Sequence, residues 1–222
     1  MTDSIAQRLE GIRQQIPDGV RLIAVTKQVS VEAMRAAYAA GIRDFGENRL
    51  QEALPKLEQL ADLPDLSWHF IGHLQANKAK KVLEHFSWIH SVDSLKLAQY
   101  LNHLAVDLPQ PPSVCLQVKI LPDPNKYGWE VPELLADLPQ LEQLEYLKIQ
   151  GLMAILPLGL TESEISAAFE SVRDLSQKIA RQSRLSMGQL SMGMSDDYLP
   201  AIAAGATMVR LGRIIFGARF NV

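Results

Sequence analysis

The chain has few of the features with which proteins form disulfides or bind charged polymers. Its 222 residues include a single cysteine, Cys115, which excludes an internal disulfide. Within the apolar run VCLQV this cysteine indicates a buried thiol in a reducing compartment. The net charge is −3, and the basic residues are scattered rather than gathered into a patch. We therefore expect no nucleic-acid partner, because such binding needs a concentrated positive surface.

Long apolar runs are missing as well. None approaches the roughly 20 residues that cross a bilayer. The N-terminal stretch MTDSIAQRLE is polar and lacks the apolar core of a signal peptide. The sequence therefore predicts a cytoplasmic protein without a membrane partner.

Several motifs of enzymes and metal sites are also absent. The chain has no Ser/His/Asp order, no zinc-ligand spacing and no glycine-rich dinucleotide loop. His69 and His73 stand four residues apart in WHFIGH, but the glutamate of a helical HExxH motif is missing. This segment is predicted to end a strand, so we expect no metal site.

The sequence does contain a regular alternation of apolar, β-prone runs and amphipathic helical segments. Eight strands are predicted at 22–26, 42–46, 67–72, 88–92 and 114–120, within 146–154, up to 191, and at 207–211. A helix with a Ser4/Gln7 capping box precedes the first of them. This cadence is typical of a (β/α)8 TIM-type barrel, and a doubly wound sheet of six or seven strands is the alternative. No linker interrupts the pattern, so residues 1–222 are predicted to form a single domain.

The first strand leads directly to a lysine. The run 22–26 is typical of a strand buried on both faces, and Lys27 follows at its C-terminal end. In closed α/β barrels this end of the strands holds the active site. A partly desolvated lysine there can attack a carbonyl and form an imine. The alternative is a lysine that only reaches from a strand end to water.

Two further stretches near the C-terminus suggest a phosphate site. Ser191 and Gly193 lie in the SMGMS segment after the seventh strand, and Gly212 and Arg213 follow the eighth. Loops in these positions commonly hold phosphorylated ligands in barrels. The glycines would let backbone N–H groups approach an anion, or they serve only tight turns.

Charged and polar residues near these stretches are also expected at or near the mouth of the barrel. Arg210 lies in a strand that reads as buried, so it needs a carboxylate, a bound anion or a ring nitrogen at the barrel mouth. Asp196 and Asp197 would repel an anion and are predicted to cap the next helix. Asn48 follows the second strand, and a loop with His73, Gln75 and Asn77 follows the third, so both are expected at the mouth.

Seven motifs spread over the chain are specific enough to indicate a family. They are AVTK ending at Lys27, FGENRLQE at 45–52, WHFIGHLQANK at 68–78, SVDS at 91–94, GLMAI at 151–155, LSMGMSDDY at 190–198 and MVRLGRIIFGAR at 208–219. Together they resemble the YggS/PROSC family of pyridoxal phosphate (PLP) homeostasis proteins, whose fold is similar to the N-terminal barrel of alanine racemase.

The resemblance implies a complete set of cofactor contacts. It implies PLP held as a Schiff base on Lys27, a phosphate bound by the SMGM loop and the turn after the last strand, and an arginine facing either the pyridine nitrogen or the phosphate. The implied cofactor-binding residues are Lys27, Asn48, Ser191, Met192, Gly193, Arg210, Gly212 and Arg213.

Two departures from the family pattern concern the mouth rather than the phosphate motifs. Members commonly have a proline soon after the lysine, where this chain has Gln28 and Val29. The loop after the fifth strand reads LPDPNKYGW and keeps only Lys126 and Gly128 of the usual pattern.

The resemblance and the length of the chain together favour a role without turnover. Racemisation needs an acid/base group on each face of the cofactor, and in alanine racemase a second domain and the partner subunit supply one of them. All 222 residues are used here by the barrel. We therefore expect a monomeric, non-catalytic protein that buffers, carries or regulates PLP, with PLP-dependent apoenzymes as recipients. The alternatives are an amino-acid racemase using Lys27 and a loop residue such as Tyr127, or a Schiff-base aldolase.

Overall fold

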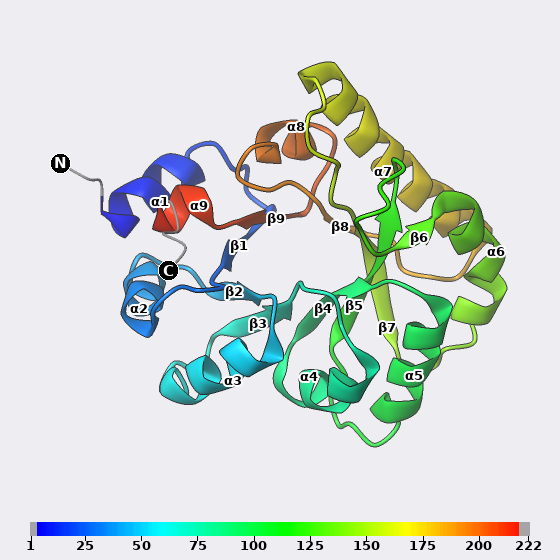
Figure 1. Cartoon of the computed structure of the whole chain (residues 1–222), viewed down its shortest axis with the longest axis horizontal. Coiled ribbons are helices and arrows are strands. Elements are labelled where there is room, and N and C mark those ends of the chain that lie inside the picture. The colour runs from blue at the N-terminus through cyan, green and yellow to red at the C-terminus, as the bar shows by residue number, and fades with distance from the viewer. Residues whose placement is uncertain (1–3, 218–222) are drawn as a thin grey trace.

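The computed structural model describes residues 4–217, and in it eight parallel strands close into a barrel surrounded by helices (Figure 1). The barrel strands are β1 (Arg21–Val25), β2 (Asp44–Glu47), β3 (Ser67–Phe70), β4 (Trp88–Val92), β5 (Ser113–Lys119), β7 (Lys148–Met153), β8 (Gln189–Ser191) and β9 (Met208–Leu211). Pairing of β4 with β5 closes the ring. The predicted (β/α)8 barrel is therefore confirmed, and the alternative open sheet is wrong. Ala218 and Arg219 of the last motif lie outside the described residues.

The helices follow the strands in alternation. They are α1 (Ile5–Arg13), α2 (Val31–Ala39), α3 (Leu50–Gln59), the 3-10 turn η1 (Ala76–Lys78), α4 (Ala79–His85), α5 (Leu95–Ala105), α6 (Val131–Leu141), α7 (Glu162–Gln182), α8 (Tyr198–Ala203) and α9 (Arg213–Phe216). None of the helices within residues 4–217 combines the length and hydrophobicity needed to cross a membrane.

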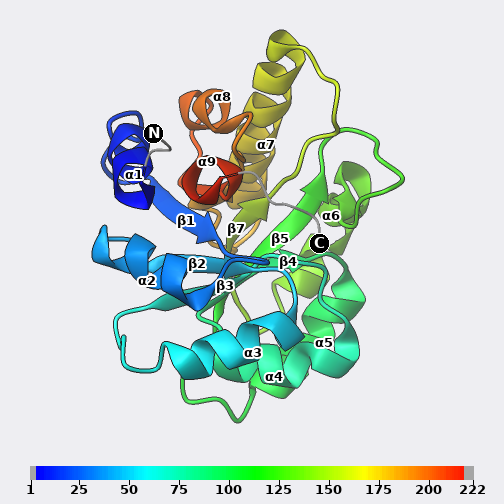
Figure 2. The ribbon, with the colours of Figure 1, turned by 60° about the vertical axis from the view of Figure 1, so that its left-hand side comes forward.

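The extra helix before the barrel has the predicted capping box. The Ser4 hydroxyl accepts from the Gln7 backbone N–H, and the Gln7 side chain accepts from the Ser4 N–H in return. Figures 1 and 2 both show α1 beside α9, and Arg8 Nε donates to the carbonyl oxygen of Ile215 at 2.6 Å. Because α9 follows directly from β9, this contact ties the first helix to the C-terminal side of the barrel.

Two details of the elements differ from the sequence-based expectation. A two-residue strand, β6 (Trp129–Glu130), pairs with the end of β5 in a region predicted to be a loop. Two residues are too few to produce a periodic pattern, so this strand depends on tertiary contacts, among them the hydrogen bond from Gln117 Nε2 to the Tyr127 carbonyl (2.8 Å). In addition, β1 ends at Val25, one residue before the predicted end at residue 26, so Lys27 lies in the turn beyond the strand.

The main hydrophobic core fills the space between the barrel and its helices, whereas the barrel interior is mixed in character. Ile23, Cys115, Met153 and Met208 form a small apolar cluster inside the barrel. Cys115 is completely buried, as predicted, and burial raises the pKa of its thiol to about 12. Four buried polar side chains, those of His69, His90, Ser191 and Arg210, share this interior, whereas branched apolar side chains normally fill such barrels.

Candidate functional site

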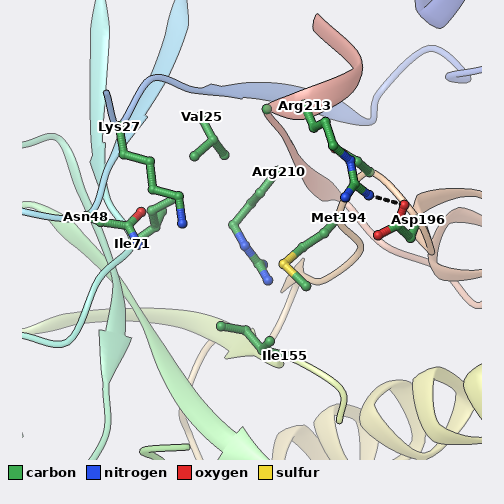
Figure 3. A pocket seen from close by; sticks show the side chains of 11 residues that line it. Val25, Lys27, Asn48, Ile71, Ile155, Met194, Asp196, Arg210 and Arg213 are labelled. Atoms are coloured by element: carbon green, nitrogen blue, oxygen red, sulfur yellow. Dashed lines mark hydrogen bonds and ion pairs between the residues drawn. The ribbon is translucent and has the colours of Figure 1, made fainter. Parts of the chain in front are cut away.

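A cavity of about 280 Å³ opens at the C-terminal ends of the barrel strands (Figure 3). This volume is just below the range of about 300–1,000 Å³ that is typical of small-molecule sites. The cavity is lined by Val25, Lys27, Asn48, Ile71, Ile155, Met194, Ser195, Asp196, Arg210, Gly212 and Arg213. The lining residues come from the ends of several strands, as expected for a site at the mouth of a barrel.

Lys27 is held in place by a sharp turn after β1. Gln28 has a positive φ of 57°, which is uncommon for a residue with a side chain. The Val29 N–H donates to the Thr26 carbonyl (2.9 Å) and closes the turn. Thr26 is completely buried, and its hydroxyl donates to Glu47 Oε1 at 2.6 Å. The residue before Lys27 is therefore anchored to the end of β2, which fixes where the lysine side chain enters the cavity.

Asn48 follows Glu47 and lies beside Lys27 in Figure 3. The two residues are brought together because β1 and β2 are paired, with Val25 opposite Gly46. The side-chain oxygen Oδ1 of Asn48 is buried and has no hydrogen-bond partner among the described residues. Buried polar atoms are nearly always hydrogen-bonded, so this orphaned oxygen indicates a polar ligand group in the cavity.

The backbone at Asn48 tolerates no side chain at Gly72. A Cβ atom added at Gly72 would lie 2.1 Å from the Asn48 carbonyl oxygen. We expect Gly72→Ala to lower the free energy of unfolding by about 3 kcal/mol, because a clash between backbone segments cannot be relieved by rotating a side chain. Urea denaturation measures this change. Gly188→Ala is the matched control, since a Cβ there meets nothing within 4 Å; equal stability of the two variants would contradict the prediction.

Arg210 supplies a buried positive charge under the cavity. Its side chain is 4% exposed and donates to Ser191 O (2.6 Å), Ser191 Oγ (2.7 Å) and Ala154 O (2.9 Å). Burial lowers the pKa of the guanidinium to about 10, which leaves it protonated at neutral pH. All three of these hydrogen-bond acceptors are neutral oxygens. The carboxylate partner considered from the sequence is present as Asp197, whose negative charge acts on the guanidinium and raises its pKa.

The SMGM segment lies largely behind the cavity wall. Ser191 and Met192 are completely buried, and neither lines the cavity. Gly193 has a φ of +93°, and a Cβ there would lie 2.7 Å from the Cβ of Ala201 in α8, so this glycine serves helix packing. Contact of these three residues with a phosphate stays a prediction. The following Met194 and Ser195 do line the cavity, which the motif alone did not indicate.

The two aspartates after this segment differ in role. Asp197 occupies the N-cap position of α8, but its side chain makes no cap hydrogen bond. Its Oδ1 accepts instead from the Met194 N–H at 2.6 Å, which stabilises the loop. Asp196 forms an ion pair with Arg213 at the rim of the cavity, and both side chains are more than half exposed. The prediction that both residues cap α8 is thus wrong except for the position of Asp197.

The loop after β3 contributes to the surroundings of the mouth rather than to the cavity itself. His73 stacks on Tyr127, with ring centroids 3.6 Å apart, and its Nδ1 lies 2.9 Å from Asp93 Oδ2. Neither Gln75 nor Asn77 lines the cavity. His69 points into the barrel interior, and no group of three or more metal-binding side chains occurs among residues 4–217.

Two buried histidines occupy the polar interior below the site. His69 Nδ1 lies 2.8 Å from His90 Nε2, and His90 Nδ1 lies 2.7 Å from Ser191 Oγ. Burial lowers the pKa of His69, and burial lowers the pKa of His90 well below its ordinary value, with the neighbouring His69, Arg210 and Arg21 acting in the same direction. Both side chains are therefore neutral in the folded protein at neutral pH.

This neutrality makes the stability of the fold dependent on pH. Below about pH 6.5 the unfolded chain protonates His69 and His90 while the folded protein does not, so stability falls as pH falls toward the folded-state pKa values. We expect a loss of about 1.4 kcal/mol per pH unit for each histidine in this window. Urea unfolding of the wild type and His90→Asn at pH 7.5 and 5.5 measures it. In His90→Asn the free energy of unfolding should fall less between pH 7.5 and pH 5.5 than in the wild type. In the control His85→Asn, which changes an exposed histidine, it should fall as much as in the wild type. An unchanged slope in His90→Asn would refute the assignment.

Comparison with known proteins places this chain in a family. Residues 1–220 match the family model described as alanine racemase, N-terminal domain. A pyridoxal phosphate homeostasis protein of Synechocystis sp. is 56% identical over 204 residues, covering 92% of this chain and 94% of its own length. Its namesake in Escherichia coli K12 is 39% identical over 232 residues, covering 98% of this chain and 97% of its own length.

Solved structures agree with these matches. PipY of Synechococcus elongatus with PLP bound has a TM-score of 0.93 and 52% identity, covering 96% of this chain and all of PipY. An alanine racemase of Clostridium difficile has a TM-score of 0.81 at 16% identity, which shows a shared fold, and the match covers 99% of this chain but 58% of the racemase. By its matched domain and its relatives, this chain belongs to the pyridoxal phosphate homeostasis proteins of the alanine racemase N-terminal domain family.

Proposed function

We propose that this protein binds PLP in the cavity at the barrel mouth and serves PLP homeostasis. The observation that carries the proposal is the order of the cavity's charged groups in Figure 3. Lys27 lies on one side with Asn48, Arg213 lies on the other, and Arg210 lies between them. This order matches PLP, which has an aldehyde, a polar ring and a phosphate group.

Each of these residues has a distinct task in the proposal. Lys27 would hold PLP through condensation of its Nζ with the aldehyde, which releases water, and Arg213 with the backbone at Gly212 would hold the phosphate. Arg210 faces the ring, and Asn48 offers its orphaned side-chain oxygen to a polar group of the ligand. Bound PLP supplies a carbonyl that condenses with primary amines and a ring that withdraws electrons.

We further propose that the protein holds PLP without catalytic turnover. Moving a proton on both faces of a substrate needs two acid/base groups, and the cavity offers few candidates. Its titratable lining residues are Lys27, two arginines and Asp196, which is paired with Arg213. Tyr127, the residue considered for a racemase, is 57% exposed, stacks on His73 and does not line the cavity. The open mouth suits exchange of PLP with recipient apoenzymes by a monomeric protein.

A transfer assay and a turnover assay test this role. PLP-loaded protein is mixed with an apo-form of a PLP-dependent enzyme, and recovery of that enzyme's activity is followed against free PLP. The same protein is incubated with L- or D-alanine, and optical rotation is followed. We expect recovery of enzyme activity and no sustained racemisation. Racemisation that continues over many turnovers and is lost in Lys27→Ala would establish the racemase alternative instead.

A further inference from the structure

A continuous chain of hydrogen bonds runs through the barrel interior from the N-terminal end of β2 to Arg210 at the cavity. Asp44 Oδ1 lies 2.9 Å from His69 Nε2, and His69 Nδ1 lies 2.8 Å from His90 Nε2. His90 Nδ1 lies 2.7 Å from Ser191 Oγ, which accepts from Arg210 Nη1 at 2.7 Å. The five residues come from five strands of the barrel: β2, β3, β4, β8 and β9.

The direction of every hydrogen bond in this chain follows from its charged end. The Arg210 guanidinium can only donate, so Ser191 Oγ accepts from it. The buried Ser191 proton then has one partner left, His90 Nδ1, and is hydrogen-bonded only if this nitrogen is unprotonated and accepts it. Neutral His90 therefore carries its proton on Nε2 and donates to His69 Nδ1.

The same reasoning fixes the other end of the chain. Because His69 accepts at Nδ1, its proton is on Nε2 and is donated to the Asp44 carboxylate. Asp44 is the final acceptor of the chain and also lies 3.8 Å from Arg21 Nε. All the bonds thus point from Arg210 to Asp44, and such aligned bonds reinforce one another in a buried environment.

We propose that His90 is a positioning residue for the ligand cavity, because it takes the Ser191 proton and so holds Ser191 Oγ as an acceptor for the Arg210 guanidinium. His69 and Asp44 fix the tautomer of His90 that this role requires. The inference rests on the proposed function in one respect, namely that Arg210 faces the bound PLP.

The contacts of Arg210 explain why Ser191 Oγ has to be held as an acceptor by His90. Its two acceptors other than Ser191 Oγ are backbone carbonyls, which cannot rotate away. The Ser191 hydroxyl can rotate, and a His90 protonated on Nδ1 would leave the hydroxyl proton without this acceptor and free to turn toward the Arg210 guanidinium. Burying a histidine is costly unless both of its ring nitrogens are hydrogen-bonded. Both nitrogens of His69 and both nitrogens of His90 have partners in this row of hydrogen bonds.

The tautomers can be measured directly in the PLP-free protein. Nitrogen-15 NMR of histidine-labelled protein at pH 7.5 is expected to show His69 and His90 both neutral with the proton on Nε2. His69→Gln and His90→Asn variants assign the two signals. A His90 protonated on Nδ1, or a charged His90, would overturn the inference whether or not the protein binds PLP.

Two amide substitutions then test the effect on binding. The Asn oxygen can replace the acceptor at Nδ1, whereas Gln extends its amide toward the Nε2 position. We expect His90→Asn to bind PLP within about threefold of the wild type and His90→Gln to bind about tenfold more weakly, a loss equal to about one hydrogen bond. In a Ser191→Ala background the difference between the two should disappear, because His90 acts through Ser191.

The outcomes separate this inference from the proposed function. Urea denaturation first confirms that each variant is folded under the binding conditions. A wild type that does not bind PLP refutes the proposed function, while the tautomers still test the chain. A wild type that binds PLP, with His90→Gln binding as tightly as His90→Asn, refutes the positioning role alone. A difference that persists in the Ser191→Ala background also refutes it.

Discussion

Lys27→Ala is expected to weaken PLP binding by at least about a hundredfold, or roughly 2.7 kcal/mol, and to remove the visible absorption band of the bound cofactor. The loss is large because the proposed covalent bond depends on the amine of Lys27. Among the described residues, no other lysine lines the cavity. Titration with PLP, followed by absorbance, measures the dissociation constant.

A second lysine near the mouth provides the control for this experiment. Lys126 lies in the loop before β6, forms an ion pair with Asp123 at 2.6 Å and does not line the cavity. Lys126→Ala should therefore bind PLP like the wild type. If Lys126→Ala loses the absorption band and Lys27→Ala keeps it, the assignment of the covalent residue is wrong.

Arg210→Met is expected to lower both the stability of the PLP-free protein and its affinity for PLP. The substitution leaves Ser191 O, Ser191 Oγ and Ala154 O without their donor, at about 1 kcal/mol each, so the free energy of unfolding should fall by about 3 kcal/mol. Loss of the charge facing the ligand should raise the dissociation constant of PLP about tenfold or more. Urea denaturation and PLP titration measure the two effects separately.

Arg213→Met separates the two effects. Arg213 lines the same cavity, but its side chain is 58% exposed and its ion pair with Asp196 is a surface pair of little energetic value. We expect the variant to lose affinity for PLP while its stability stays within about 0.5 kcal/mol of the wild type. Equal stability of the Arg210 and Arg213 variants would mean that the buried hydrogen bonds of Arg210 do not support the barrel.

The parts of the structure that the sequence predicted are those governed by local patterns. Continuous apolar runs mark strands that are buried on both faces, and Ser4 with Gln7 marks the start of the first helix, where the structure has the capping box. Lys27 was found for the same reason, because a lysine after such a run stands out. Asn48 was predicted at the barrel mouth because it follows the C-terminal end of the second strand.

The features that the sequence did not reveal depend on residues that are distant along the chain. His69, His90 and Ser191 meet only because three strands face the same barrel interior, and nothing near His90 in the sequence indicates a partner 101 residues away. The orientation of the SMGM loop was also hidden, because α8 decides that Gly193 packs inward while Met194 faces the cavity. The two-residue strand β6 was too short for any periodic signal.

The central claim is that PLP is held on Lys27, and reduction with borohydride tests it most directly. The purified protein, loaded with PLP, is examined by visible absorption before and after reduction and is then cleaved for peptide mapping by mass spectrometry. We expect a yellow protein that bleaches on reduction and carries a phosphopyridoxyl group on Lys27. A protein that cannot be loaded with PLP, or a label on a different lysine, would contradict the claim.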